Sequence, residues 1–105
     1  MQRFHVYELR SATGRAAYPY VLNVQGELVD DLRTRVVVPL APAARFKGKA
    51  ISRLMPLLDF GGESWVMLTA QLGAIRLRDM GKDVADLSGE RFTIIAAIDV
   101  LLSGN

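Results

Sequence analysis

Short runs of apolar and β-branched residues, separated by glycine, proline and polar residues, make up most of the chain. Apolar and polar positions alternate loosely within the first run, as they do along a strand with one buried face. The run at 34–40 holds three consecutive valines, which favour a pleated backbone. The intervening stretches at 27–32 and 41–50 predict connections. The pattern predicts strands at 2–9, 18–25, 34–40, 52–60, 63–69 and 74–77.

Turn-forming residues mark the expected ends of these strands. The sequence at 11–14 predicts a turn after the first strand, and Pro39 and Pro42 are expected to close the third. Gly61 and Gly62 predict a tight hairpin, because both central positions of such a turn require positive φ.

The hydrophobic period changes near the end of the chain. Apolar residues there recur at helical spacing, at positions 92, 94, 95, 98, 101 and 102. Ser88 is expected to be the N-cap, and Glu90 lies in the first turn, where it favours the helix dipole. Gly104 stands where a helix would stop. The pattern therefore predicts one C-terminal helix after a series of short strands.

The composition fits a single domain over residues 1–105 with one core. Half of the residues are hydrophobic, which suggests that a second subunit covers part of the apolar surface. There is no cysteine, so disulfides and thiolate chemistry are excluded, as suits a reducing cytoplasm. No run approaches the roughly 20 apolar residues of a membrane helix. We therefore expect a soluble, cytoplasmic protein without membrane contact.

The formal charge of +2 does not by itself indicate a nucleic-acid groove. Acidic residues lie near the basic ones in the sequence, as Asp30 and Asp31 do before Arg33. We expect a mixed, solvated surface with no specific nucleic-acid partner. The basic residues form three scattered groups: Arg33 and Arg35; Arg45, Lys47 and Lys49; Arg76 and Arg78.

Catalytic patterns are missing from the sequence. His5 is the only histidine, and a packed or surface histidine is the expected role. Gly61-Gly62 is not followed by the Lys-Ser/Thr of a phosphate-binding loop, and Asp30-Asp31 is expected to be solvated rather than to bind a metal. Trp65 and Met67 should share one strand face and pack in the core or an interface, as should Met55. We expect no enzyme activity, no cofactor and no metal.

Five stretches resemble, in the same order, stretches of the CcdB toxins. Each is short, but together they extend over nearly the whole chain, with a slightly longer first loop around 11–17. The stretches are VQGELVD at 24–30, TRVVVPL at 34–40, ESWVMLT at 63–69, VADLS at 84–88 and AID at 97–99.

This resemblance implies a mainly β (α+β) fold: an SH3-like barrel with an antiparallel sheet, a small additional sheet and a C-terminal helix, assembled as a homodimer. It also implies the toxin of a type II toxin–antitoxin system. Such a toxin binds the DNA gyrase A subunit and traps the gyrase–DNA cleavage complex. A cognate CcdA-like antitoxin neutralises it.

The resemblance places the gyrase-binding hydrophobic pair on Leu28 and Val29. It places the remaining gyrase contacts on the terminal helix and its tip, at Asp99, Leu102, Ser103, Gly104 and Asn105. The family's helix position is usually asparagine where this chain has Asp99. Some members end in an aromatic–Trp–Gly–Ile tip, of which only Gly104 is kept here.

Physical chemistry leaves two roles open for this tip. The last carbonyls of a helix lack intrahelical partners, and with the terminal carboxylate they would attract a cation such as arginine. Alternatively, Gly104 is only a C-cap and the terminal residues fray. Loss of an interface tryptophan costs roughly 2–4 kcal/mol. A CcdB-like protein with weakened or retargeted toxicity is therefore the alternative, and a MazF-like endoribonuclease using Thr34 and Arg35 is a further one.

Overall fold

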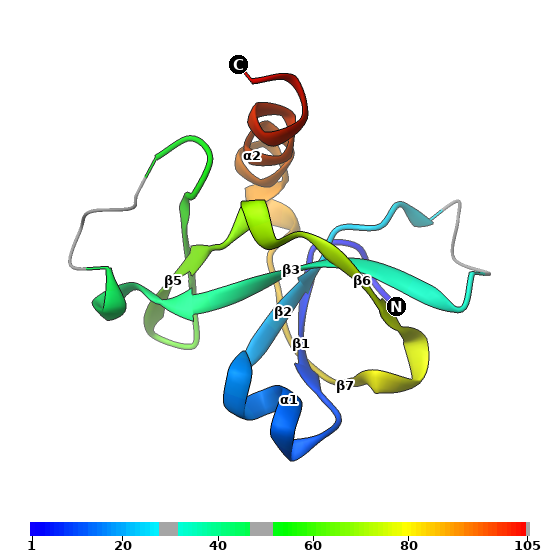
Figure 1. Ribbon diagram of the computed structural model, residues 1–105. Helices are drawn as coiled ribbons and strands as arrows, with labels where there is room; N and C mark the ends of the chain where they lie inside the picture. The colour runs from blue at the N-terminus through cyan, green and yellow to red at the C-terminus, as the bar shows by residue number, and fades with distance from the viewer. Residues whose placement is uncertain (28–31, 47–51, 105) are drawn as a thin grey trace.

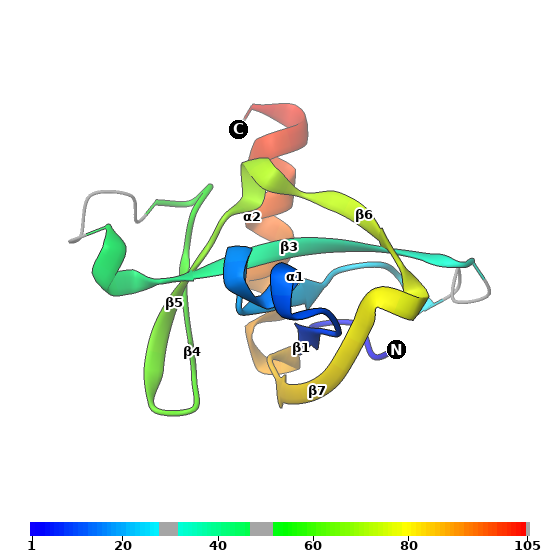
Figure 2. The ribbon, with the colours of Figure 1, turned by 60° about the horizontal axis from the view of Figure 1, so that its bottom comes forward.

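Strand β3 (Thr34–Pro42) organises the sheet, because it pairs along both of its edges. The computed structural model describes residues 1–27, 32–46 and 52–104. One edge of β3 pairs with β2 (Tyr20–Asn23). The other edge pairs first with β6 (Gly73–Arg76) and then with β5 (Glu63–Met67). Strand β3 therefore crosses the whole molecule and joins its two ends (Figure 2).

The remaining strands extend this sheet on both sides. Strand β1 (His5–Leu9) lies between β2 and β7 (Met80–Asp86), and β4 (Leu57–Phe60) pairs with β5. The order is β4-β5-β3-β2-β1-β7, with β6 on β3, and every pairing is antiparallel. The sheet curls into a half-barrel beside helix α2 (Arg91–Ser103) (Figure 1). The expected mainly β fold with a C-terminal helix is confirmed. The expected small additional sheet corresponds to the β4–β5 hairpin, which is part of the same sheet because β5 pairs with β3.

Consecutive residues on a strand belong to different hydrophobic clusters, so apolar side chains pack on both faces of the sheet. Val6, Leu22 and Val38 lie in the main core, whereas Tyr7 and Val21 lie in a second cluster. The main core also contains two fully buried residues of α2, which ties the helix to the sheet. These helix residues are Ile94 and Ala97.

Three aromatic side chains pack against one another at one end of the main core. Trp65 stacks on Phe60 with ring centroids 5.3 Å apart, and Tyr20 meets both rings edge-on. Trp65 and Met67 share the buried face, as alternation predicts, whereas Met55 packs on a third cluster around Val66. The indole Nε1 of Trp65 is buried and has no hydrogen-bond partner among the described residues.

This geometry predicts that Trp65→Phe is far milder than Trp65→Ala. Phenylalanine keeps most of the ring contacts and removes an unsatisfied N–H group, so the expected cost is below about 1.5 kcal/mol. Alanine leaves a cavity, at a cost of roughly 3–5 kcal/mol. Urea unfolding followed by circular dichroism measures both values. Equal losses for the two variants would contradict this packing.

The stretch after the first strand forms a helix and not the predicted turn. Helix α1 (Ala12–Ala17) begins at Ser11, whose Oγ accepts a hydrogen bond from the Gly14 N–H at 2.9 Å. The Arg15 guanidinium donates to the carbonyl groups of Leu9 and Arg10. Ser11 is thus an N-cap, which is the role in which serine most favours a helix.

The third strand does not close at Pro39 but continues to Pro42. Pro39 falls between the residues of β3 that pair with β6 and those that pair with β5. Its carbonyl accepts from the Leu68 N–H at 3.0 Å. Because no partner strand needs an N–H at this point, the proline does not interrupt the strand.

Two other predictions about strands change. Only 57–60 of the expected strand at 52–60 is extended, since Ser52 and Met55 bond each other in a turn. Strand β7 was not predicted, and its residues are mostly exposed. The hairpin at Gly61 and Gly62 is confirmed, with φ of 62° and 78°.

Candidate functional site

The start of helix α2 is held by hydrogen bonds from the preceding turn. The Asp86 carboxylate accepts from the Ser88 N–H at 2.8 Å, and the Leu87 N–H donates to the Phe4 carbonyl at 2.8 Å. A short 3₁₀ turn, η5 (Ser88–Glu90), then leads into the helix. The prediction of Ser88 as N-cap is wrong: Glu90 holds that position, without a side-chain bond. The turn before the helix, and not a cap, fixes its direction.

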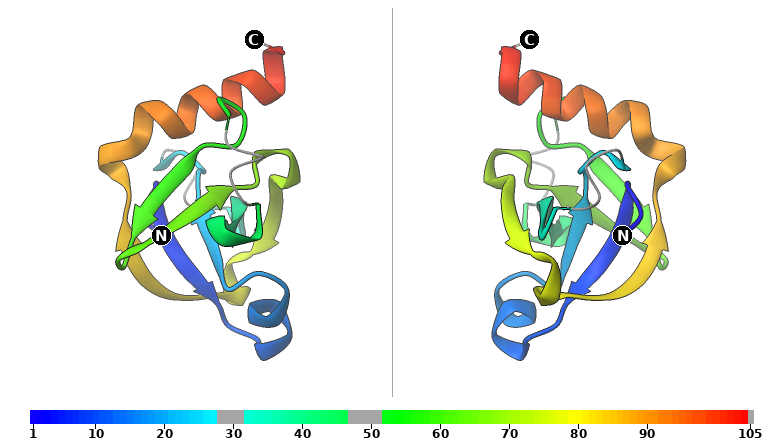
Figure 3. Two further views of the ribbon diagram at one scale, coloured as in Figure 1. Left: turned by 90° about the vertical axis from the view of Figure 1, so that its left-hand side faces the viewer. Right: turned by 90° about the vertical axis from the view of Figure 1, so that its right-hand side faces the viewer.

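The inner face of α2 packs on the sheet. Ile94 and Ala97 are completely buried, and Ile98 and Leu101 are half-buried. These residues follow the three- and four-residue spacing of one helix face. Figure 3 shows the helix along one side of the molecule, with its C-terminal end farthest from the sheet.

The outer face of α2 carries large apolar side chains without cover. Phe92 is 75% exposed, Leu102 is 77% exposed and Ile95 is 41% exposed. Asp99 lies on the same face and is also exposed. At about 100° per residue, these four residues fall within an arc of roughly 80°. We call them the outer stripe.

The outer stripe has the chemistry of a binding surface. Exposed apolar side chains gathered on one helix face mark an interaction site. The Asp99 carboxylate has no hydrogen-bond or ion-pair partner in the described part of the chain. The Arg91 guanidinium lies 5.1 Å from the centre of the Phe92 ring and flanks the stripe at its start. A matching partner would present apolar groups and a cation opposite Asp99.

The tip of the helix closes in the predicted way. Gly104 adopts a left-handed conformation with φ of 76°, and its N–H donates to the Val100 carbonyl at 2.8 Å. The Ser103 hydroxyl donates to the Asp99 carbonyl at 2.6 Å. The C-cap role of Gly104 is confirmed. Since Ser103 and Gly104 satisfy two carbonyls of the last turn, the tip offers fewer free acceptors than the sequence indicates.

The structure brings together only some of the site residues expected from sequence. Asp99, Leu102, Ser103 and Gly104 all lie in the last turns of α2 or at its end. The others lie outside the described residues: Leu28, Val29 and Asn105. Sequence reasoning missed Phe92 and Ile95 as outward-facing residues. A helical wheel would have separated them from the inner face.

His5 and Arg35, the residues that the sequence offers for catalysis, have other roles in the structure. The His5 Nδ1 lies 2.8 Å from the Asp83 carboxylate and its Nε2 lies 3.4 Å from Asp86, in a surface cluster between β1 and β7. Arg35 is 2% exposed, and its guanidinium donates to the carbonyl groups of Leu32 and Thr34. A buried arginine bonded to the backbone does not suit an RNA-cleaving groove. The described residues contain no acidic, histidine or cysteine cluster able to hold a metal.

The Asp86 carboxylate makes the stability of the turn before α2 depend on pH. The Ser88 backbone N–H, and secondly its hydroxyl, hydrogen-bond the charged carboxylate and hold the pKa of Asp86 below its ordinary value of 3.8. A pKa that is lower in the folded chain adds stability above the unfolded pKa. That stability is lost as the pH falls through the folded pKa.

We therefore expect Asp86→Asn to be less stable than the wild type at neutral pH, with the unfolding free energies of the two proteins converging in acid. Urea unfolding across this pH range checks the result, and parallel curves would contradict it.

A comparison with known protein families gives a match over nearly the whole chain. A family model described as CcdB protein matches residues 3–104. The match includes the whole described sheet from β1 to β7 and the whole of α2. Among the described residues, no helix is long and apolar enough to cross a membrane.

Proposed function

The chain belongs to the CcdB family of toxins from toxin–antitoxin systems, and we propose that it acts by binding the A subunit of DNA gyrase. In this proposal it traps the gyrase–DNA cleavage complex, and a CcdA-like antitoxin neutralises it. The observation that carries the proposal is the outer stripe, an uncovered apolar helix face at the end of a chain that matches the family over residues 3–104.

The proposed gyrase contact is the outer stripe together with the helix tip. Phe92, Ile95 and Leu102 would supply apolar area, and Asp99 would pair with a cation of the target. Gly104 has no side chain, so the partner's backbone can approach closely there. From the resemblance, the proposal extends to residues outside the described part of the chain: Leu28, Val29 and Asn105.

The missing tip tryptophan is compensated elsewhere in this proposal. An interface tryptophan contributes roughly 2–4 kcal/mol to binding. Complete burial of one large apolar side chain contributes about 1.5–3 kcal/mol. Phe92 and Leu102 are both more than two-thirds exposed, so they have most of this area left to bury. Two such residues are sufficient to offset one tryptophan.

The action is non-catalytic in this proposal, and the protein is a cytoplasmic homodimer. The one histidine among the described residues is engaged in an ion cluster with Asp83 and Asp86. Poisoning of gyrase requires only that the toxin hold one state of the enzyme more tightly than the others. Light scattering of the purified protein would measure the oligomeric state.

A gyrase pull-down with a supercoiling assay tests the proposal. The wild type is expected to retain the gyrase A subunit and to inhibit supercoiling. A variant lacking Gly104 and Asn105 is expected to fold and to lose inhibition. Equal inhibition by both proteins would show that the tip is not the site.

Two controls separate the competing functions. The wild type is expected to leave a single-stranded RNA substrate intact, and clear cleavage would overturn the gyrase proposal in favour of an endoribonuclease. Binding to an antitoxin without any effect on gyrase would instead indicate a family member with lost or retargeted toxicity.

A further inference from the structure

A second surface, independent of α2, gathers arginines around the 3₁₀ turn η4 (Leu77–Asp79). Strand pairing creates it, since Thr34 of β3 lies opposite Arg76 of β6 and the Leu77 N–H donates to the Arg33 carbonyl at 2.8 Å. Arg33 and Arg76, far apart in sequence, are thereby neighbours. With Leu77 and Arg78 they line a cavity of about 400 Å³.

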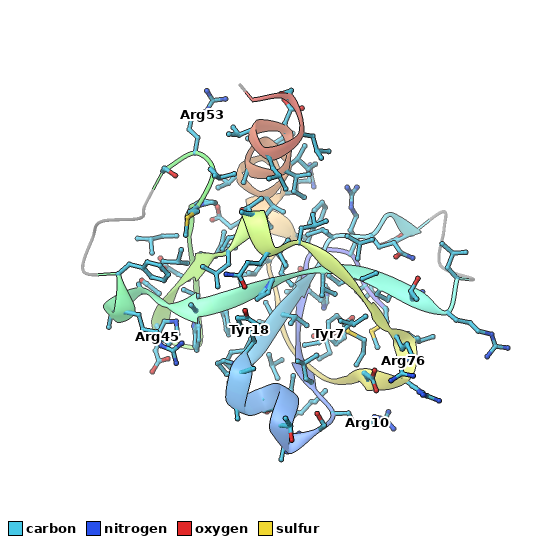
Figure 4. The ribbon with its side chains drawn as sticks, viewed as in Figure 1. Tyr7, Arg10, Tyr18, Arg45, Arg53 and Arg76 are labelled. Atoms are coloured by element: carbon cyan, nitrogen blue, oxygen red, sulfur yellow. The ribbon has the colours of Figure 1, made fainter. Side chains whose placement is uncertain are left out.

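Two further arginines extend this surface. The Arg10 N–H donates to the Asp79 carbonyl at 2.9 Å, which places the end of β1 beside η4. The Arg15 guanidinium donates to the Arg10 carbonyl at 2.7 Å. Figure 4 shows Arg10 and Arg76 in the same region, with Arg45 and Arg53 on the other side of the molecule. The basic surface consists of Arg10, Arg15, Arg33, Arg76 and Arg78.

Ion pairing with the described residues leaves most of the positive charge of the basic surface in place. One ion pair of the described residues involves it, between Arg76 Nε and Asp79 at 3.3 Å. Arg33 and Arg78 are exposed and form no ion pair with a described residue. Four of these five arginines therefore form no ion pair with a described residue. The sequence indicates a mixed, solvated surface because it separates these arginines, whereas the fold collects them.

We propose that the basic surface binds the phosphodiester backbone of duplex nucleic acid without reading its sequence. Guanidinium groups form paired hydrogen bonds with phosphate oxygens. Exposed cations around a shallow cavity suit a continuous polyanion, whose binding is driven by the release of counterions. No base-reading element is needed, so this proposal is compatible with the expectation that the chain has no specific nucleic-acid partner.

The lining of the cavity favours a duplex over the other polyanions. Leu77 is the only apolar residue among the described residues that line it, so this part of the lining offers an acidic peptide little to anchor its side chains. The described residues of the lining include no aromatic side chain on which unpaired bases could stack. The described lining therefore favours contacts with phosphates, which a duplex presents at regular spacing.

Fluorescence anisotropy tests the proposal with short labelled DNA and RNA duplexes of mixed sequence at several salt concentrations. The wild type is expected to bind in a salt-dependent way, and the two duplexes show which nucleic acid is preferred. In the double variant Arg33→Gln/Arg78→Gln, the slope of log K against log salt should fall by about two, because each phosphate contact contributes about 0.9. Affinity at low salt should fall on the order of tenfold.

The double variant Arg45→Gln/Arg53→Gln is the matched control. It removes the same charge from exposed arginines on the other side of the molecule and is expected to keep the wild-type slope. Circular dichroism confirms that both variants fold. Absence of binding by the wild type, or equal losses in the two variants, would overturn the proposal. Tighter binding of a glutamate-rich peptide than of either duplex would identify a protein-binding surface instead and would also overturn it.

Discussion

Replacement of Leu102 by aspartate is expected to weaken binding to the gyrase A subunit by about 30- to 1000-fold. Leu102 is 77% exposed, one helical turn from Asp99 on the outer stripe. A second carboxylate there removes apolar contact and adds like-charge repulsion in an interface. The loss corresponds to roughly 2–4 kcal/mol of binding free energy. Isothermal titration calorimetry with the purified A subunit measures it.

Val84→Asp provides the matched control for this experiment. Val84 is also exposed, at 36%, but lies on β7 and outside the outer stripe. It is expected to keep wild-type affinity. The free energy of unfolding of Leu102→Asp should stay within about 0.5 kcal/mol of the wild type, because Leu102 contributes little to the core. Equal weakening by both substitutions would show that the outer stripe has no special role.

Replacement of Ile94 by alanine is expected to lower the free energy of unfolding by roughly 2–5 kcal/mol. Ile94 is completely buried against the sheet, and its loss leaves a cavity between α2 and the core. The next residue, Ile95, lies on the outer stripe, so Ile95→Ala should cost less than about 1 kcal/mol. Urea unfolding of the two variants measures this difference directly.

The same pair of variants separates stability from binding. Ile95→Ala is expected to weaken gyrase binding while the fold stays intact, whereas Ile94→Ala weakens it only through loss of the folded state. Similar unfolding free energies for the two variants would contradict the assignment of the inner and outer faces.

Several elements were predictable because their signals are local. The valines of β3 and the glycines of the hairpin act through neighbouring residues, so sequence reasoning found them. Strand β7 was missed because long-range pairing with β1 makes it a strand, and its own residues are mostly exposed and show no clear alternation of apolar and polar positions. A Cβ on Gly81 would lie 2.8 Å from the Glu8 carbonyl oxygen, so this glycine allows the close approach of β1.

The candidate site was predictable only in part for a related reason. The helical period identified α2, and the C-cap role of Gly104 followed from local geometry. A helical wheel separates Phe92 and Ile95 from the inner face, but the sequence does not say which of the two faces the sheet covers, so these residues were not recognised as a free surface. The basic surface was missed because Arg33 and Arg76 meet only through the pairing of β3 with β6.

The most direct test of the proposed function is the amount of linear DNA that gyrase releases from a supercoiled plasmid when protein denaturant is added to the reaction. Linear DNA reports cleavage complexes trapped before the denaturant acts. With the wild type, linear DNA is expected to accumulate in proportion to the amount of protein, whereas Leu102→Asp should leave it at the level of gyrase alone. Absence of accumulation with the wild type, or equal accumulation with both proteins, would contradict the account.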